Sequence, residues 1–175
     1  LTLLWLVVVY LAAYAWRDWF KSLCGLILLM AVVEHPDMPK SLLGIQGLNA
    51  WNLLLADVLL AWGLARRREG LRWDMPGRMT LPLVLYLTVV VLAFVRLMFV
   101  RDRLTEDVTT AGLVSEYFIN CVKWVVPGLL LFDGCRSRTR FFWGLACTLG
   151  IYLLLAVQVI KWMPLSQDLT GEVLE

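Results

Sequence analysis

The chain alternates between long apolar runs and short polar segments. A helix rises about 1.5 Å per residue, so about 20 apolar residues are needed to cross a bilayer core of about 30 Å. Four runs meet this requirement, at 43–65, 79–100, 112–131 and 141–162, and two earlier runs, at 1–15 and 19–33, are shorter. In the second of these, Lys21 would have to extend toward the interface. The runs lack the alternation of a transmembrane barrel. We therefore predict an all-α polytopic transmembrane helix bundle with about six spans, forming one domain.

Basic residues gather in every second connecting segment. Segments 17–21, 66–78 and 133–140 hold two, five and three Lys or Arg residues, whereas the intervening segments together hold four. Because positive loops remain in the cytoplasm, the Arg-rich segments are expected there. The opposite side then receives His35, Arg101, Arg103, Glu106, Asp107 and the acidic tail with Asp168, Glu172 and Glu175.

Composition agrees with a membrane protein and narrows its chemistry. The chain is 61% apolar and 17% charged, compared with about 45–50% and about 25% in soluble domains. Nine Trp suit the membrane interface, and a net charge of +2 argues against a nucleic-acid partner. Four dispersed Cys and a single His have no metal-ligand spacing, so no metal or other cofactor is expected. The chain begins inside an apolar run and ends on an acidic stretch, and we expect it to be an excerpt of a longer protein.

The motifs GxxxxGK[ST], GxGxxG, HExxH and GxSxG are absent, so any chemistry must involve charges in or beside the membrane. Asp57 lies midway along the third run, where a lone charge costs about 2.5–3.5 kcal/mol. It therefore requires a partner, water or a proton. A functional role and a role in fastening two helices both fit this position.

Glu116, Asn120 and Lys123 follow one another at spacings that place them on one face of the fifth predicted span. One interpretation is a polar seam inside the bundle, with Asn120 bridging Glu116 and Lys123. The other is the wall of a water-filled cavity that opens to the outside.

Arg96, Arg101 and Arg103 lie near the outer end of the fourth predicted span. Guanidinium groups match phosphate oxygens, so the cluster is a candidate site for an anionic headgroup or a pyrophosphate. Interfacial anchoring also explains Arg101 and Arg103, whereas Arg96 lies several residues inside the boundary. The run Arg66–Arg68 is read as a topology signal that contacts anionic lipid.

The entry to the third span carries a recognisable segment, Gly44-Ile45-Gln46-Gly47-Leu48-Asn49-Ala50-Trp51-Asn52-Leu53-Leu54-Leu55. It resembles the Gly-Leu-Asn-(small or Pro)-aromatic-Asn-Leu-Leu segment near the start of bacterial O-antigen polymerase and ligase family membrane proteins. The stretch from Tyr117 to Trp124, followed by Gly128 to Phe132 and a basic loop, is similar to the next part of such proteins.

This resemblance implies the N-terminal half of an inner-membrane glycosyltransferase that acts on polyprenyl-diphosphate-linked glycans in cell-surface polysaccharide assembly. The family's functional outer loop lies in the second half, beyond this chain, so no catalytic residue can be assigned and the stretch alone is expected to be inactive. The alternatives are a non-enzymatic accessory or scaffold subunit of a larger membrane complex and, as a weaker reading, a transporter fragment. Expected partners are membrane lipid and either the lipid-linked glycan or other membrane subunits.

Overall fold

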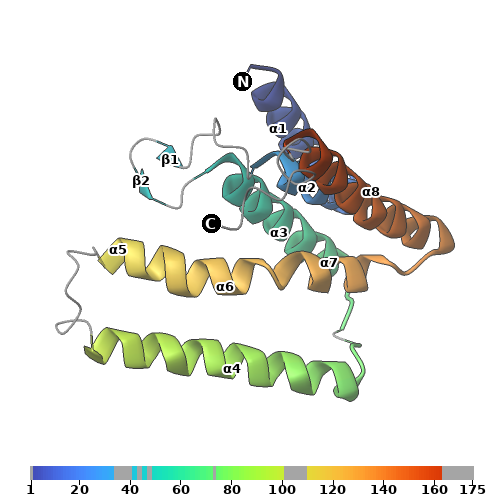
Figure 1. Ribbon diagram of the computed structural model, residues 1–175. Coiled ribbons are helices and arrows are strands. Elements are labelled where there is room, and N and C mark those ends of the chain that lie inside the picture. The colour runs from blue at the N-terminus through green and yellow to red at the C-terminus, as the bar shows by residue number, and fades with distance from the viewer. Residues whose placement is uncertain are drawn as a thin grey trace.

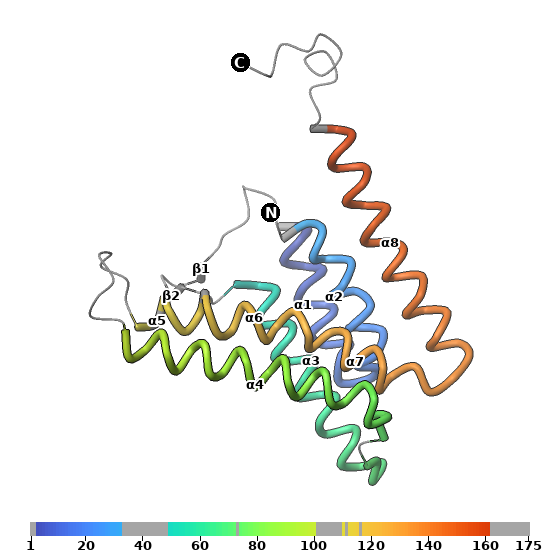
Figure 2. The backbone as a smooth tube through the Cα atoms, turned by 60° about the horizontal axis from the view of Figure 1, so that its bottom comes forward, coloured from blue at the N-terminus to red at the C-terminus, as the bar shows by residue number. Residues whose placement is uncertain are grey.

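The computed structural model describes residues 2–33, 41–42, 45–46, 49–72, 74–100 and 110–162. These residues are almost entirely helical (Figure 1). Helices α1 (Thr2–Ala15), α2 (Trp19–Val33), α3 (Ala50–Glu69) and α8 (Arg138–Trp162) form one group, in which α2 contacts the other three. A second layer consists of α4 (Gly77–Val100) beside the consecutive segments α5 (Thr110–Leu113), η2 (Val114–Ile119) and α6 (Asn120–Lys123) (Figures 1 and 2).

The predicted all-helical class is confirmed, and the six predicted apolar runs correspond to helical segments. The run 19–33 coincides with α2, whereas α4 and α8 extend slightly beyond their predicted bounds. The predicted start of the third span, at residue 43, is wrong. Two-residue strands β1 (Ser41–Leu42) and β2 (Ile45–Gln46) pair antiparallel, and the helix begins only at Ala50.

Local chemistry fixes both ends of α3. The side-chain oxygen of Asn49 accepts a hydrogen bond from the backbone N–H of Asn52 at 2.8 Å, which satisfies one of the free donors of the first turn. At the other end Gly70 adopts φ +62°, and its N–H returns to the last carbonyls of the helix. Glycine suits this left-handed conformation because it has no Cβ.

The predicted span 112–131 is not one regular α-helix. It divides into α5 (Thr110–Leu113), a π-helical segment η2 (Val114–Ile119), α6 (Asn120–Lys123) and α7 (Val126–Gly134). The break between α6 and α7 precedes Pro127, whose ring lacks an N–H and would clash with the carbonyl of Lys123 in a continuous helix. The apolar run was correctly located, but its interruption was not predicted.

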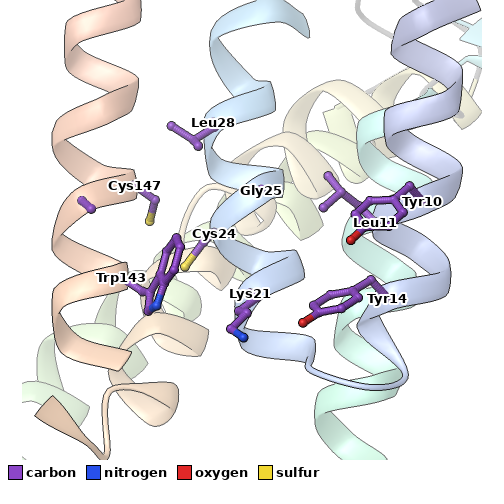
Figure 3. Close-up of a pocket in the computed structure, with 10 residues that line it drawn as sticks. Tyr10, Leu11, Tyr14, Lys21, Cys24, Gly25, Leu28, Trp143 and Cys147 are labelled. Carbon is purple, nitrogen blue, oxygen red and sulfur yellow. The ribbon is translucent and has the colours of Figure 1, made fainter. Parts of the chain in front are cut away.

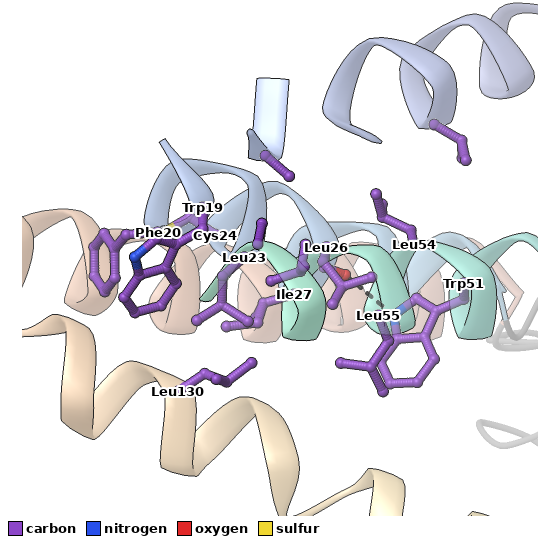
Figure 4. Close-up of a cluster of buried hydrophobic side chains, with 14 of the residues drawn as sticks. Trp19, Phe20, Leu23, Cys24, Leu26, Ile27, Trp51, Leu54, Leu55 and Leu130 are labelled. Carbon is purple, nitrogen blue, oxygen red and sulfur yellow. Dashed lines mark hydrogen bonds between the residues drawn. The ribbon is translucent and has the colours of Figure 1, made fainter. Parts of the chain in front are cut away.

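The core lies between α2, α3 and α7 (Figure 4). Phe20, Leu23 and Leu26 of α2 are fully buried, and Leu54 of α3 and Leu130 of α7 are almost so. Truncating such a buried Leu to Ala costs about 2–5 kcal/mol, so this cluster is the main source of tertiary stability.

Two helices, α4 and α8, are long and apolar enough to cross a membrane. In the most apolar part of α4, almost no residue is buried inside the described structure. In the corresponding part of α8, 11% of the residues are buried. An apolar helix of this kind that is not covered by protein is suited to lipid or to further helices. The shorter apolar stretches Leu3–Ala15 and Trp19–Val32 lie below the spanning length, so these data support a helical membrane protein without counting its spans.

Candidate functional site

The residues predicted from sequence fall on different parts of the second layer. Arg96 lies on α4 and is exposed, Glu116 lies in η2, and Asn120 and Lys123 are the first and last residues of α6. The predicted partners Arg101 and Arg103 lie outside the described residues.

Lys123 is directed toward the beginning of α3. Its ammonium nitrogen lies 5.7 Å from the ring centroid of Trp51 and 5.5 Å from that of Trp124, and the two indoles are 6.2 Å apart. The buried indole N–H of Trp51 donates to the carbonyl of Leu26 at 3.2 Å. Cation–π attraction to two rings keeps the charge of Lys123 among aromatic faces.

Helix α4 packs against the same layer through other residues. The Tyr86 hydroxyl donates to the carbonyl of Cys121 at 3.1 Å, and the rings of Phe94 and Phe118 are 5.2 Å apart. These contacts join α4 to η2 and α6, and Arg96 is exposed on α4, whereas Lys123 lies near the first turn of α3. The described geometry therefore supports two separate basic positions rather than one established anion site.

Because η2 is π-helical, Glu116, Asn120 and Lys123 do not follow the α-helical spacing that predicts one shared face. The backbone N–H of Asn120 donates to the carbonyl of Ser115, an i→i+5 bond. A π-helical turn rotates the following residues relative to an α-helix, so α-helical spacing does not carry from Glu116 to Asn120. Such turns occur frequently at functional sites, and this one carries the candidate acid Glu116.

Asp57 joins α3 to the turn that directly follows α1. The Trp16 indole N–H donates to Oδ1 of Asp57 at 3.1 Å, so the partner required by the sequence argument is present. The second oxygen, Oδ2, is buried and has no hydrogen-bond partner among the described residues. The contact supports the interpretation of Asp57 as a helix-fastening residue.

A charged cluster that the sequence did not predict surrounds Asp133, which is only 3% exposed. The Trp62 indole donates to Oδ2 at 2.7 Å, Arg136 donates to Oδ1 at 2.7 Å, and Arg66 forms an ion pair with Oδ1. We call Trp62, Arg66, Asp133 and Arg136 the Asp133 cluster. It links α3 to the end of α7, at the level of the Arg-rich segments.

Electrostatics keep Asp133 ionised. Burial alone raises the pKa of Asp133, but hydrogen bonds from Arg66, Arg136 and Trp62 outweigh it and hold this pKa below its usual range. The hydrogen bond to Asp133 in turn raises the pKa of Arg136, which also contacts Asp74 at 3.0 Å. Sequence reasoning read Arg66 as a topology signal and Asp133 as a loop residue. The sequence offered one clue to this cluster, because Asp133 is a carboxylate directly after an apolar run.

No protein family, curated protein or solved structure matches this chain. Within the part of the chain that the structure describes, no group of three or more His, Cys, Asp or Glu residues is arranged to hold a metal ion.

Proposed function

We propose that the chain is the N-terminal transmembrane part of a polymerase or ligase that assembles cell-surface polysaccharide from polyprenyl-diphosphate-linked glycans. About six helices cross the bacterial inner membrane in this proposal, and the Arg-rich loops face the cytoplasm. The apolar, uncovered surfaces of α4 and α8 support the membrane placement. The segment Gly44–Leu55 supports the family assignment by its resemblance.

The observation that carries the proposal is the role that residues of this segment have in the fold. Asn49 caps α3, Trp51 fastens α3 to α2 through the Leu26 carbonyl, and Leu54 fills the core. These residues begin α3, attach it to α2 and fill the core beside it. A sequence motif whose residues have such structural roles marks a shared fold. It accounts for the likeness to the polymerase and ligase family without assigning catalysis to these residues.

The proposed orientation is supported by the position of the basic segments. Arg66 of α3 reaches Asp133 at the end of α7, and Arg140 at the start of α8 lies 3.7 Å from Asp18 in the turn between α1 and α2. All three Arg-rich segments thus meet at one end of the helices, as loops on one side of a membrane must.

Arg96 is the proposed contact for the diphosphate. Transfer of a glycan from a polyprenyl diphosphate leaves negative charge on the departing diphosphate, and a fixed guanidinium near it lowers the barrier. Arg101 and Arg103 extend this positive region in the proposal, whereas Glu116, Asn120 and Lys123 line the route toward it.

The test replaces Arg96 by Ala in the full-length protein and measures polymer length and amount on a polysaccharide gel. Arg78→Ala is the matched control, because Arg78 is exposed near the opposite end of α4. We expect loss of one phosphate contact to lower polymer formation by about tenfold or more, and the control to be unaffected. Equal output from both variants at equal expression would remove Arg96 from the mechanism.

Orientation is tested separately with reporter fusions. Alkaline phosphatase joined after Arg72 should be inactive, and the same reporter joined after Glu106 should be active, because the enzyme requires export. The reverse pattern would contradict the orientation and leave the glycan proposal to be judged by the Arg96 variant.

A scaffold subunit is the second candidate, and α4 favours it. Val90 is the only residue of this 24-residue helix whose side chain is buried in the described structure. A helix so poorly covered can receive helices of another subunit as readily as helices of a longer chain. A scaffold should co-purify at fixed stoichiometry with its partner subunits, whereas a polymerase should retain lipid-linked glycan.

A further inference from the structure

A lateral groove lies between α1, α2 and α8 (Figure 3). It has a volume of about 400 Å³ and an almost wholly apolar lining. Tyr10 and Tyr14 of α1 form one wall, and Trp143 of α8 forms the other. Gly25 forms part of the floor, where a Cβ would come within 2.7 Å of Leu11, so a larger residue would disturb the α1–α2 contact.

The groove is long enough to hold the part of a lipid chain nearest its headgroup. Along α2 it extends from Lys21 to Leu28, a rise of about 10 Å. One leaflet contributes half of a hydrocarbon core of about 30 Å, so the groove covers most of one leaflet. An apolar groove with these limits suits a single extended acyl chain better than a compact polar ligand.

Charge is confined to one end of the groove. Lys21 lies at the end marked by Tyr14 and Trp143, and Leu28 lies at the other (Figure 3). Beside that end is a smaller polar cavity of about 210 Å³, which Arg17 and Arg140 help to line. The carboxylate of Asp18 is shared by Lys21 at 3.6 Å and Arg140 at 3.7 Å.

The polar end of the groove has a positive excess. Arg17, Arg68 and Arg140 line the smaller cavity together with Asp18 and Glu69, and Lys21 lines the groove beside it, so four cations lie there with two carboxylates. Trp19 and Phe20 hold the Arg140 guanidinium by cation–π contacts of 5.7 and 5.4 Å, which fixes its position at the interface. Basic pockets between transmembrane helices on the cytoplasmic side are suited to anionic headgroups.

We propose that this groove is a binding site for an anionic phospholipid of the cytoplasmic leaflet, with one acyl chain between α1, α2 and α8 and the phosphate beside Lys21 and Arg140. The site differs in position and ligand from the proposed glycan site around Arg96. It rests on the membrane placement proposed above, but not on the glycan chemistry.

The test reconstitutes the purified full chain in equal mixtures of dioleoyl phosphatidylglycerol and dioleoyl phosphatidylcholine and counts the lipids retained by native mass spectrometry. Ala146 lines the groove and is exposed, so Ala146→Phe fills the groove from α8. Ala156→Phe adds the same ring to an exposed position of α8 that does not line the groove. We expect Ala146→Phe to lose the retained phosphatidylglycerol and Ala156→Phe to keep it.

The headgroup contact is tested by Lys21→Gln, with Arg67→Gln as an exposed cationic control outside both cavities. Loss of one interfacial charge should reduce the preference for phosphatidylglycerol by about fivefold. Ala146→Leu, a smaller change, provides a second filling variant should Ala146→Phe fail to fold, and it should lower lipid retention in part.

Three results would overturn the proposal: undiminished retention in a folded Ala146 variant, an unchanged headgroup preference in Lys21→Gln, or displacement of the lipid by soluble glycerol 3-phosphate alone. The last result would indicate a free phosphate site without an acyl chain. Failure of the membrane placement is distinguishable, because the chain would then be recovered without detergent.

Discussion

The side chain of Asp133 holds together α3 and α7, two helices that are far apart in the sequence. Its carboxylate accepts from Trp62 and Arg136 and pairs with Arg66. Removing one partner of a buried ion pair costs about 3–5 kcal/mol, because the remaining charge loses its compensation. We expect Asp133→Asn to destabilise the protein by about this amount in SDS-titrated unfolding. Asp74→Asn, which removes an exposed partner of Arg136, should cost at most about 1 kcal/mol.

The same carboxylate predicts a pH dependence. Its folded-state pKa is lowered, so its stabilisation is complete above the unfolded pKa of about 4 and is lost as pH falls through the folded pKa. The stability difference between wild type and Asp133→Asn should therefore shrink when unfolding is measured from pH 7 down to about 3. A difference that stays constant or widens in acid would show that ionised Asp133 does not stabilise the fold.

Trp51 offers a test of the contact between α2 and α3. Trp51→Phe removes the hydrogen bond to the Leu26 carbonyl and weakens the contact with Lys123, so we expect a loss of about 1–2 kcal/mol. Trp51→Ala should cost about 3–5 kcal/mol because it also leaves a cavity. Trp143→Phe, at a half-exposed ring, should change the unfolding midpoint little.

Residue-level chemistry was only partly accessible from the sequence. The need of Asp57 for a partner followed from the cost of an isolated charge in lipid, but nothing in the sequence identified Trp16 as that partner. The Asp133 cluster was missed because Trp62 and Asp133 are 71 positions apart, and only tertiary packing brings them together. The predicted shared face of Glu116 and Asn120 presupposes an α-helix, whereas the backbone there is π-helical.

At the scale of elements, a glycine inside α3 and the glycine directly after it should respond oppositely to the same change. Gly70 has φ +62°, so Gly70→Ala forces a side chain into the left-handed region at a cost of about 1–2 kcal/mol. Gly63 lies inside the helix with open space where a Cβ would be, so Gly63→Ala should stabilise by about 0.5–1 kcal/mol. The unfolding midpoint measures both, and a shift in the same direction for both variants would contradict the C-cap geometry.

Helix positions were predictable because long apolar runs have few alternatives in lipid, whereas interruptions were not. The predicted and observed limits of α2 coincide, and those of α8 differ only at its beginning. Pro127 interrupts an otherwise apolar run, but proline is tolerated in many membrane helices, so its presence alone did not require a break. The late start of α3 followed from the cap at Asn49, a signal that was visible in the sequence but was placed inside the predicted span.

For the whole molecule, the positions of the apolar helices could be predicted, but their arrangement could not. Hydropathy records how apolar a segment is and says little about which neighbour covers it. It therefore gave no sign that α2 contacts α1, α3, α7 and α8 while α4 stays almost uncovered. Because α4 is almost uncovered by protein, the proposed membrane placement can be tested on this helix alone.

Val89 is 63% exposed and lies near the middle of α4, and Met79 is 58% exposed near its beginning. In water both positions should accept Arg with little change, because exposed substitutions usually alter stability by less than about 0.5 kcal/mol. In a bilayer the two positions differ. An Arg at the helix centre costs about 2.5–3.5 kcal/mol, whereas one near the end extends its side chain to the interface. We therefore expect Val89→Arg to reduce the membrane-inserted fraction of α4 by about tenfold or more in a glycosylation-site insertion assay, and Met79→Arg to leave it nearly unchanged. Equal insertion of the two variants would mean that α4 does not cross the hydrocarbon core, and would remove the physical basis for treating its uncovered apolar face as a lipid-facing one.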